Sequence, residues 1–126
     1  MLHKFFALLL FASLQAMAAT PPELLAGYSV QAGQPANAAK GEVFFKASHG
    51  QEWQCTSCHG KSPLAGGRHA STDKAIEPLA PVANGKRFTD SAKVEKWFRR
   101  NCKDVLAREC TAAEKADVLA WLMSLR

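Results

Sequence analysis

The sequence predicts a small all-α domain of about four helices. Four stretches of the chain begin at helix-start signals, and no stretch shows the persuasive alternation of apolar and polar residues that is typical of a strand. The chain has 126 residues, which is the size of one domain. Because so small a domain buries only a limited apolar core, we expect a bound apolar group to contribute part of the packing.

The N-terminal residues have the pattern of a secretory signal peptide. A short apolar run, Phe5 to Leu14, is followed by the small residues Ala16-Met17-Ala18. About ten apolar residues are too few to cross a hydrocarbon core of roughly 30 Å as a helix, although an uncleaved segment could act as a weak anchor. We therefore expect residues 1–18 to be a signal peptide cleaved near Ala18, residues 19–126 to form one domain, and the mature protein to be periplasmic without stable membrane insertion.

Two helices are predicted in the first part of the mature chain, and a long loop follows them. The stretch Pro21 to Val30 opens with Pro-Pro-Glu and breaks at Gly33 to Pro35, and Asn37 introduces a second helix over Ala38 to Ala47. The stretch Gly60 to Asn84 is rich in Gly, Pro, Ser and Lys, so we expect a loop that wraps a cofactor.

Two further helices are predicted in the last part of the chain. They run from Thr89 or Asp90 through Asn101, and from a capping box of Thr111 and Glu114 through Leu125. In the first of them, one face that we expect to turn toward the core carries Val94, Trp97, Phe98 and Asn101. An unpaired amide buried there would cost roughly 1 to 3 kcal/mol, so Asn101 should make a hydrogen bond, cap its helix or bind something.

The most specific motif of the chain is Cys55-Thr56-Ser57-Cys58-His59. A Cys-X-X-Cys-His sequence is typical of covalent attachment of a c-type haem. In that interpretation Cys55 and Cys58 form the two thioether bonds, and the imidazole of His59 is the proximal iron ligand. The motif therefore predicts one covalently attached haem c.

Two other interpretations of the cysteine pair have less support. A thioredoxin-like redox pair needs a βαβ setting, and no Val/Ile-rich strand run precedes Cys55. A zinc site needs two more Cys or His ligands at short spacing, and His69 is the one nearby candidate.

The residues alone leave the second iron ligand open. The usual methionine ligand is missing, because Met1 and Met17 fall in the predicted signal peptide and Met123 lies near the C-terminus. Where a ligand methionine would be expected, between the haem motif and the next helix, the chain has Leu79. Asn101, Met123 and His69, the last in a bis-histidine arrangement, remain as candidates.

Several runs of residues resemble those of the sphaeroides haem protein family, monohaem c-type cytochromes that bind oxygen. These runs are Pro78-Leu79-Ala80-Pro81, Arg87 to Trp97, Arg100-Asn101-Cys102, Cys110-Thr111 and Glu114 to Asp117. The resemblance implies a small class I cytochrome c-like fold around one covalent haem, with His59 as proximal ligand and Asn101 as distal ligand. It also implies a disulfide between Cys102 and Cys110, a pairing that an oxidising compartment favours for the two cysteines left by the haem.

The resemblance implies an electron carrier and gas-binding protein more than an enzyme. A neutral, hard amide oxygen suits ferric iron better than ferrous iron. We therefore expect reduction to release Asn101 and to open the iron to O2, NO or CO. The alternatives are a plain electron-transfer cytochrome with a closed six-coordinate haem (His69 or Met123 distal) and a haem enzyme that reduces O2, peroxide or nitrogen oxides.

The charge of the chain suggests its partners. The formal net charge is +5, and basic residues surround the predicted ligand helix: Lys86, Arg87, Lys93, Lys96, Arg99, Arg100, Lys103 and Arg108. Such a surface could steer an acidic redox partner protein, possibly another c-type cytochrome, to the haem. No nucleic-acid partner is expected, because no recognition motif is present.

Overall fold

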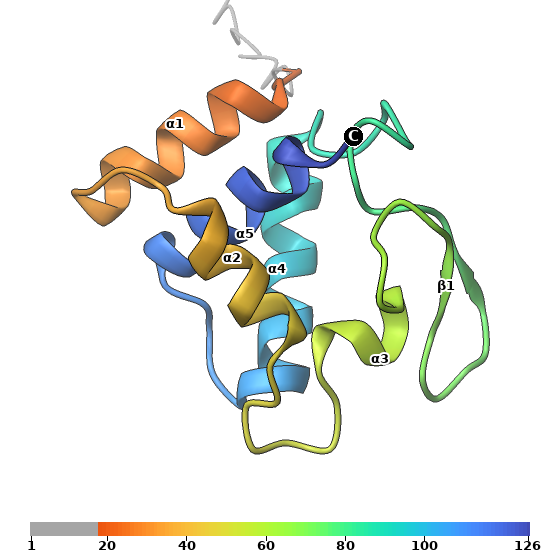
Figure 1. Cartoon of the computed structure of the whole chain (residues 1–126). Coiled ribbons are helices and arrows are strands. Elements are labelled where there is room, and N and C mark those ends of the chain that lie inside the picture. The colour runs from red at the N-terminus through yellow and green to blue at the C-terminus, as the bar shows by residue number, and fades with distance from the viewer. Residues whose placement is uncertain (1–17) are drawn as a thin grey trace, which may run out of the picture.

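The computed structural model describes residues 18–126, so nearly all of the predicted signal peptide lies outside the described residues. Within them the chain forms five helices and one pair of short strands (Figure 1). The helices are α1 (Pro21–Ala32), α2 (Ala38–Lys46), α3 (Cys55–His59), α4 (Ser91–Leu106) and α5 (Ala112–Ser124). None of the helices in the described part is long and apolar enough to cross a membrane.

The start signals in the sequence cap the helices as predicted. The side chain of Asn37 accepts a hydrogen bond from the Lys40 amide at the start of α2, and Asp90 accepts one from the Lys93 amide at the start of α4. Helix α1 begins one residue after Thr20, which forms a capping box with a glutamate three residues later. Local capping therefore determines where these helices begin, independently of the packing around them.

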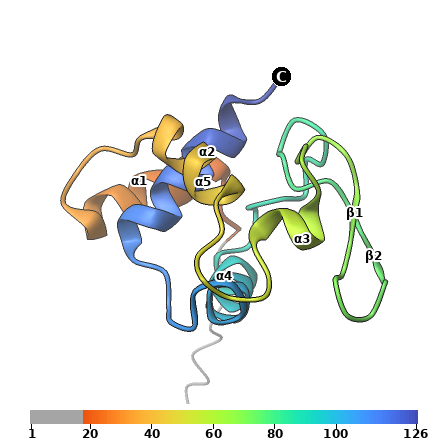
Figure 2. The ribbon, with the colours of Figure 1, turned by 60° about the horizontal axis from the view of Figure 1, so that its bottom comes forward.

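Helix α5 is the centre of the hydrophobic core. It packs against α1 and α2, which Figures 1 and 2 show crossing it. Its buried residues are Ala116, Asp117, Val118, Leu119, Trp121 and Leu122. The buried Asp117 accepts a hydrogen bond from the backbone amide of Asn37 at 2.6 Å, so its one polar group is satisfied.

Helix α4 is longer than the sequence predicted. It continues past Asn101 to Leu106 and ends at Ala107, which adopts the left-handed conformation with φ of 57°. The sequence predicted an end at Asn101, but the buried residues Cys102 and Val105 extend the buried stripe of the helix by another turn. Asn101 therefore lies inside the helix and does not cap it.

The segment from Gly60 to Asn84 is mostly irregular, as predicted, but it contains two short strands. Strands β1 (Gly67–Arg68) and β2 (Ala75–Ile76) pair antiparallel, with Gly67 opposite Ile76. Because each strand has only two residues, the prediction of the all-α class is confirmed. In both views α3 lies between α4 and this hairpin (Figures 1 and 2).

We predict that Gly41→Ala destabilises the protein by about 3 kcal/mol, because its new methyl group overpacks a helix contact. A Cβ atom at Gly41 in α2 would overlap the carbonyl oxygen of Asp117 in α5. Gly27→Ala in α1 is the matched control, since a Cβ there meets no atom within 4 Å, and it should stabilise the protein by about 0.5 to 1 kcal/mol. Denaturant unfolding of the haem-loaded protein measures both. Equal effects of the two substitutions would contradict the close α2–α5 contact.

Candidate haem-binding site

The predicted haem-attachment residues all lie on α3. This helix is a single turn, and Gly60 ends it with φ of 70°, a conformation that favours glycine. Cys55 and Cys58 are half-buried free thiols. A short helix of this kind places two cysteines three residues apart on one side, with the histidine directly after them.

The β1–β2 hairpin packs closely on α3. A Cβ atom at Gly67 would overlap the carbonyl oxygen of Cys58, so the backbones touch at a point where only glycine fits. The backbone amide of Ala70 donates a hydrogen bond to the Cys58 sulfur at 3.3 Å. The sequence predicted the loop but gave no signal for these two contacts.

The side chain of His59 points into the protein interior and is neutral. Its ring centroid lies 6.1 Å from that of the buried Phe45. Burial, together with the positive charge of Arg87, lowers the pKa of His59 to about 4. At neutral pH the imidazole is therefore in the unprotonated form that a metal ion requires.

The surroundings of the two thiols do not match a redox-active pair. Burial raises the pKa of the Cys55 thiol to about 11. A thioredoxin-like exchange site needs a thiolate with a lowered pKa. Within residues 18–126, no three His, Cys, Asp or Glu side chains come together in a group that could hold a metal ion.

Arg87 holds the chain segment that precedes α4. Its guanidinium donates to the carbonyl oxygens of Pro78 at 2.9 Å and Glu77 at 2.8 Å. The next two backbone amides, of Leu79 and Ala80, both donate to the carbonyl oxygen of Pro63 at 3.0 Å. Arg87 was expected to be part of the basic surface. In the structure it instead has a structural role beside His59.

The expected core face of α4 is only partly correct. Val94 is buried and Phe98 packs against the core, but Trp97 is 43% exposed and Asn101 is exposed as well. The buried stripe follows Val94, Cys102 and Val105, so α1, α2 and α5 leave the Trp97–Asn101 edge uncovered. The side chain of Asn101 makes no hydrogen bond within the described residues, so the lone pairs of its amide oxygen are not engaged there.

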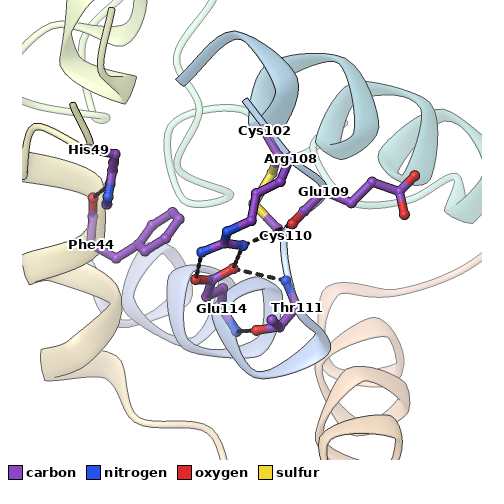
Figure 3. Close-up of polar contacts among 8 residues, drawn as sticks. All are labelled: Phe44, His49, Cys102, Arg108, Glu109, Cys110, Thr111 and Glu114. Atoms are coloured by element: carbon purple, nitrogen blue, oxygen red, sulfur yellow. Dashed lines mark hydrogen bonds and ion pairs between the residues drawn. A yellow bond between two sulfur atoms is a disulfide. The ribbon is translucent and has the colours of Figure 1, made fainter. Parts of the chain in front are cut away.

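A disulfide joins α4 to the start of α5. Cys102 and Cys110 are bonded, with Cα atoms 5.6 Å apart, and both residues are buried. Beside the disulfide, Arg108 binds both carboxylate oxygens of Glu114 at 2.9 and 2.8 Å (Figure 3). Glu114 also completes the predicted capping box with Thr111. The turn between the two helices is thus closed by one covalent link and one ion pair.

The other candidate iron ligands have different contacts. His69 lies in the turn between β1 and β2, where its Nδ1 accepts hydrogen bonds from the amides of Ser71 and Thr72 at 3.3 Å. His49 contacts the carbonyl oxygen of Phe44 at 2.9 Å (Figure 3). Met123 packs against the core, as expected of a residue that fills space there.

The chain is similar to known proteins over most of its length. The sequence profile of a family described as a domain of unknown function (DUF1924) matches residues 31–122. Cytochrome c-type protein SHP from Cereibacter sphaeroides is 48% identical over 107 residues, which is 82% of each chain. The chain belongs to the sphaeroides haem protein family.

Solved structures and a second relative are also similar to this chain. A structure described as oxidized SHP, an oxygen binding cytochrome c, matches with a TM-score of 0.80 and 47% identity, over 85% of this chain and 98% of that chain. Cytochrome c'' from Methylophilus methylotrophus is 43% identical over 88 residues, 67% of this chain and 61% of that protein. Its oxidized crystal structure matches with a TM-score of 0.71.

Membership of this family identifies the protein as a monohaem cytochrome that carries covalently attached haem c. The residues present fit that cofactor. Two free thiols and a neutral imidazole lie together on α3, and the Trp97–Asn101 edge of α4 offers an aromatic surface and an uncommitted amide.

We predict that replacing Cys102 and Cys110 together by alanine lowers the free energy of unfolding by about 2.6 kcal/mol, the chain-entropy value for a loop of nine residues. Both sulfurs are buried, so their loss also removes packing at the α4–α5 turn. Urea unfolding of the haem-loaded protein, followed by circular dichroism, gives the difference. An unchanged unfolding midpoint would contradict a stabilising role for the bond.

Proposed function

We propose that this protein is an exported cytochrome that transfers electrons and binds a diatomic ligand, O2, NO or CO, at ferrous haem after release of Asn101. The observation that carries the proposal is the free amide of Asn101 on an uncovered edge of α4, one residue before a disulfide. The family relation supports it, because the solved structure of SHP is described as that of an oxygen binding cytochrome c.

The proposed haem ligands are those of the sequence motif. Cys55 and Cys58 would hold the haem through thioether bonds, and His59 would offer its neutral imidazole to the iron as the proximal ligand. The haem supplies reversible one-electron chemistry and an iron atom to which small ligands can bind. The neutral state of His59 supports this role, since a protonated imidazole could not coordinate iron.

Asn101 provides the redox dependence. Its amide oxygen is a neutral, hard donor that holds ferric iron and that ferrous iron binds poorly. On reduction the side chain of Asn101 leaves, and the site becomes accessible to a small neutral molecule. We propose no such role for His69 or Met123, because the ring of His69 belongs to the hairpin turn and Met123 belongs to the core.

Export is proposed on the predicted signal peptide together with the disulfide of the folded domain. A disulfide between Cys102 and Cys110 is the state expected in the periplasm.

We predict that Asn101→Ala converts the oxidised protein from a low-spin to a largely high-spin haem spectrum, because the distal ligand is lost. Its reduced form should bind carbon monoxide as the parent protein does. Asp104→Ala is the control, since it removes another exposed polar side chain of α4. Optical and electron paramagnetic resonance spectra of the oxidised proteins provide the test. An oxidised Asn101→Ala spectrum identical to that of the parent protein would rule out the amide as a ligand.

The proposed redox partner is an acidic protein that binds the basic face of α4, defined as Lys93, Lys96, Arg99, Arg100 and Lys103. All five residues are exposed on the side of the helix opposite to its buried stripe. Arg87 and Arg108, which the sequence analysis included in the basic surface, bind backbone carbonyls and Glu114 instead. The guanidinium of Arg100 lies 5.6 Å from the ring centroid of Trp97, which brings the basic face to the Trp97–Asn101 edge.

We predict that Lys96→Glu slows reduction of the protein by an acidic c-type cytochrome about tenfold at low ionic strength, since it weakens electrostatic steering. Lys40→Glu on α2 is the matched control, because it makes the same charge change at an exposed site on another helix. Stopped-flow reduction at several salt concentrations measures the rates, and the difference should disappear in high salt. If both variants slow the reaction equally, net charge and not the basic face of α4 explains the effect.

A further inference from the structure

A polar cluster of three residues, Tyr28, Glu95 and Lys115, joins α4 to both α1 and α5. The hydroxyl group of Tyr28 in α1 donates a hydrogen bond to the carboxylate of Glu95 in α4. The ammonium group of Lys115 in α5 lies 2.9 and 3.3 Å from the two oxygens of the same carboxylate. Within residues 18–126, these are the side-chain hydrogen bonds that α4 makes to α1 and α5.

The cluster is well packed as well as hydrogen-bonded. Lys115 lies over the rings of Tyr28 and Phe98, 5.4 and 5.7 Å from their centroids, and these two rings meet edge to face. Tyr28 is only 4% exposed and the Lys115 side chain is mostly covered, whereas the Glu95 side chain is 41% exposed, so water reaches the cluster mainly at its Glu95 end. Removal of a contact in the cluster therefore affects the packing of all three helices.

The pKa values of Tyr28 and Glu95 shift in opposite directions, which keeps the hydroxyl a donor and the carboxylate an acceptor. Burial, and then the hydrogen bond to Glu95, raise the pKa of Tyr28, which stays a protonated donor. Burial on its own would raise the pKa of Glu95, but the hydrogen bonds from Tyr28 and Lys115 and the positive charges of Lys115 and Arg99 outweigh it and lower that pKa. Glu95 is thus a carboxylate held from two sides.

The position of Glu95 on α4 complements that of the disulfide. Glu95 and Cys102 are seven residues apart, so they lie on the same side of the helix, two turns or about 10 Å from each other. Each is bonded to α5, through Lys115 and through Cys110 respectively. A helix attached at one point can still roll and tilt, whereas two attachments two turns apart limit its tilt, and the bonds of Glu95 to both α1 and α5 limit its roll.

Asn101 is on a different side of α4 from these two attachments, at about 100° of rotation per residue. A roll of the helix by roughly 10° would move a side-chain atom near its surface by about 1 Å. A displacement of that size is large compared with the tolerance of a metal–ligand bond. Because Glu95 and Asn101 lie on different sides of α4, any effect of Glu95 on Asn101 acts through the rotation of the helix.

We infer that Tyr28, Glu95 and Lys115 position α4 so that Asn101 reaches the iron, and that this cluster sets how tightly the amide competes with other ligands. The inference rests on the proposed function, because it assumes that Asn101 is the distal ligand. Glu95 is a positioning residue here.

A double-mutant cycle tests the inference on the haem-loaded protein, with cyanide as the competing ligand of the oxidised form. Glu95→Gln should raise the affinity for cyanide about three- to tenfold in the parent background, because a loosened α4 weakens the competition from Asn101. In an Asn101→Ala background Glu95→Gln should change nothing, because the competitor has gone. Glu42→Gln, which neutralises an exposed carboxylate of an ion pair on α2, should be without effect in both backgrounds.

The cycle separates the two proposals from each other. If Asn101→Ala alone leaves the cyanide affinity unchanged, Asn101 is not the ligand, and both the proposed function and the positioning role are overturned. If Asn101→Ala raises the affinity but Glu95→Gln has the same effect in both backgrounds, only the positioning role is overturned.

A second variant distinguishes a positioning role from a general loss of stability. Tyr28→Phe removes one hydrogen bond of the cluster and keeps the aromatic ring, so it should change the cyanide affinity in the same direction by a smaller factor. Thermal unfolding is measured beside the affinity. Lower melting temperatures for both variants with cyanide affinities equal to the parent value would overturn the inference, since the cluster would then be purely structural.

Discussion

The attachment of α4 to α5 is the constraint on which the rest of the structure depends. Helix α5 is buried between α1 and α2 and forms the core with them. Helix α4 adds few apolar contacts to that core, and its link to α5 is concentrated in the disulfide from Cys102 and the ion pair of Glu95 with Lys115. Because the proposed distal ligand is on α4, these two links determine where that ligand lies relative to everything else.

Local chemistry explains why much of this fold could be predicted from the sequence. Asn37 and Thr111 begin helices through hydrogen bonds to amides three residues away, so neighbouring residues are sufficient to locate them. The haem motif is equally local. The true end of α4 could not be predicted, because Cys102 and Val105 are buried by parts of the chain outside their own helix. The same holds for Gly67, whose role depends on the backbone of Cys58, and for the uncovered edge at Trp97.

The electrostatics of the candidate site keep its donors uncharged. Burial lowers the pKa of His59 and raises that of Cys55, so both groups are neutral at physiological pH. Two carboxylates are paired away from α3, Glu95 with Lys115 and Glu114 with Arg108, and Arg87 supplies a positive charge beside His59. A haem edge can thus approach α3 without displacing a buried ion pair, which would be costly to break.

The two proposed iron ligands come from helices that make few direct contacts with each other. Helix α3 contacts α2 and the hairpin, whereas α4 is joined to α5. Hydrogen bonds nevertheless tie together the segments between them, because Arg87, just before α4, holds the Glu77 and Pro78 carbonyls, and the amides of Leu79 and Ala80 bind the carbonyl oxygen of Pro63, which follows α3. Since the proposed attachment through Cys55 and Cys58 would fix the haem to α3, the separation of α3 from α4 decides whether Asn101 reaches the iron. Arg87 therefore acts on both sides of the proposed site, because its hydrogen bonds hold the segment before α4 and its charge adds to the effect of burial in lowering the pKa of His59.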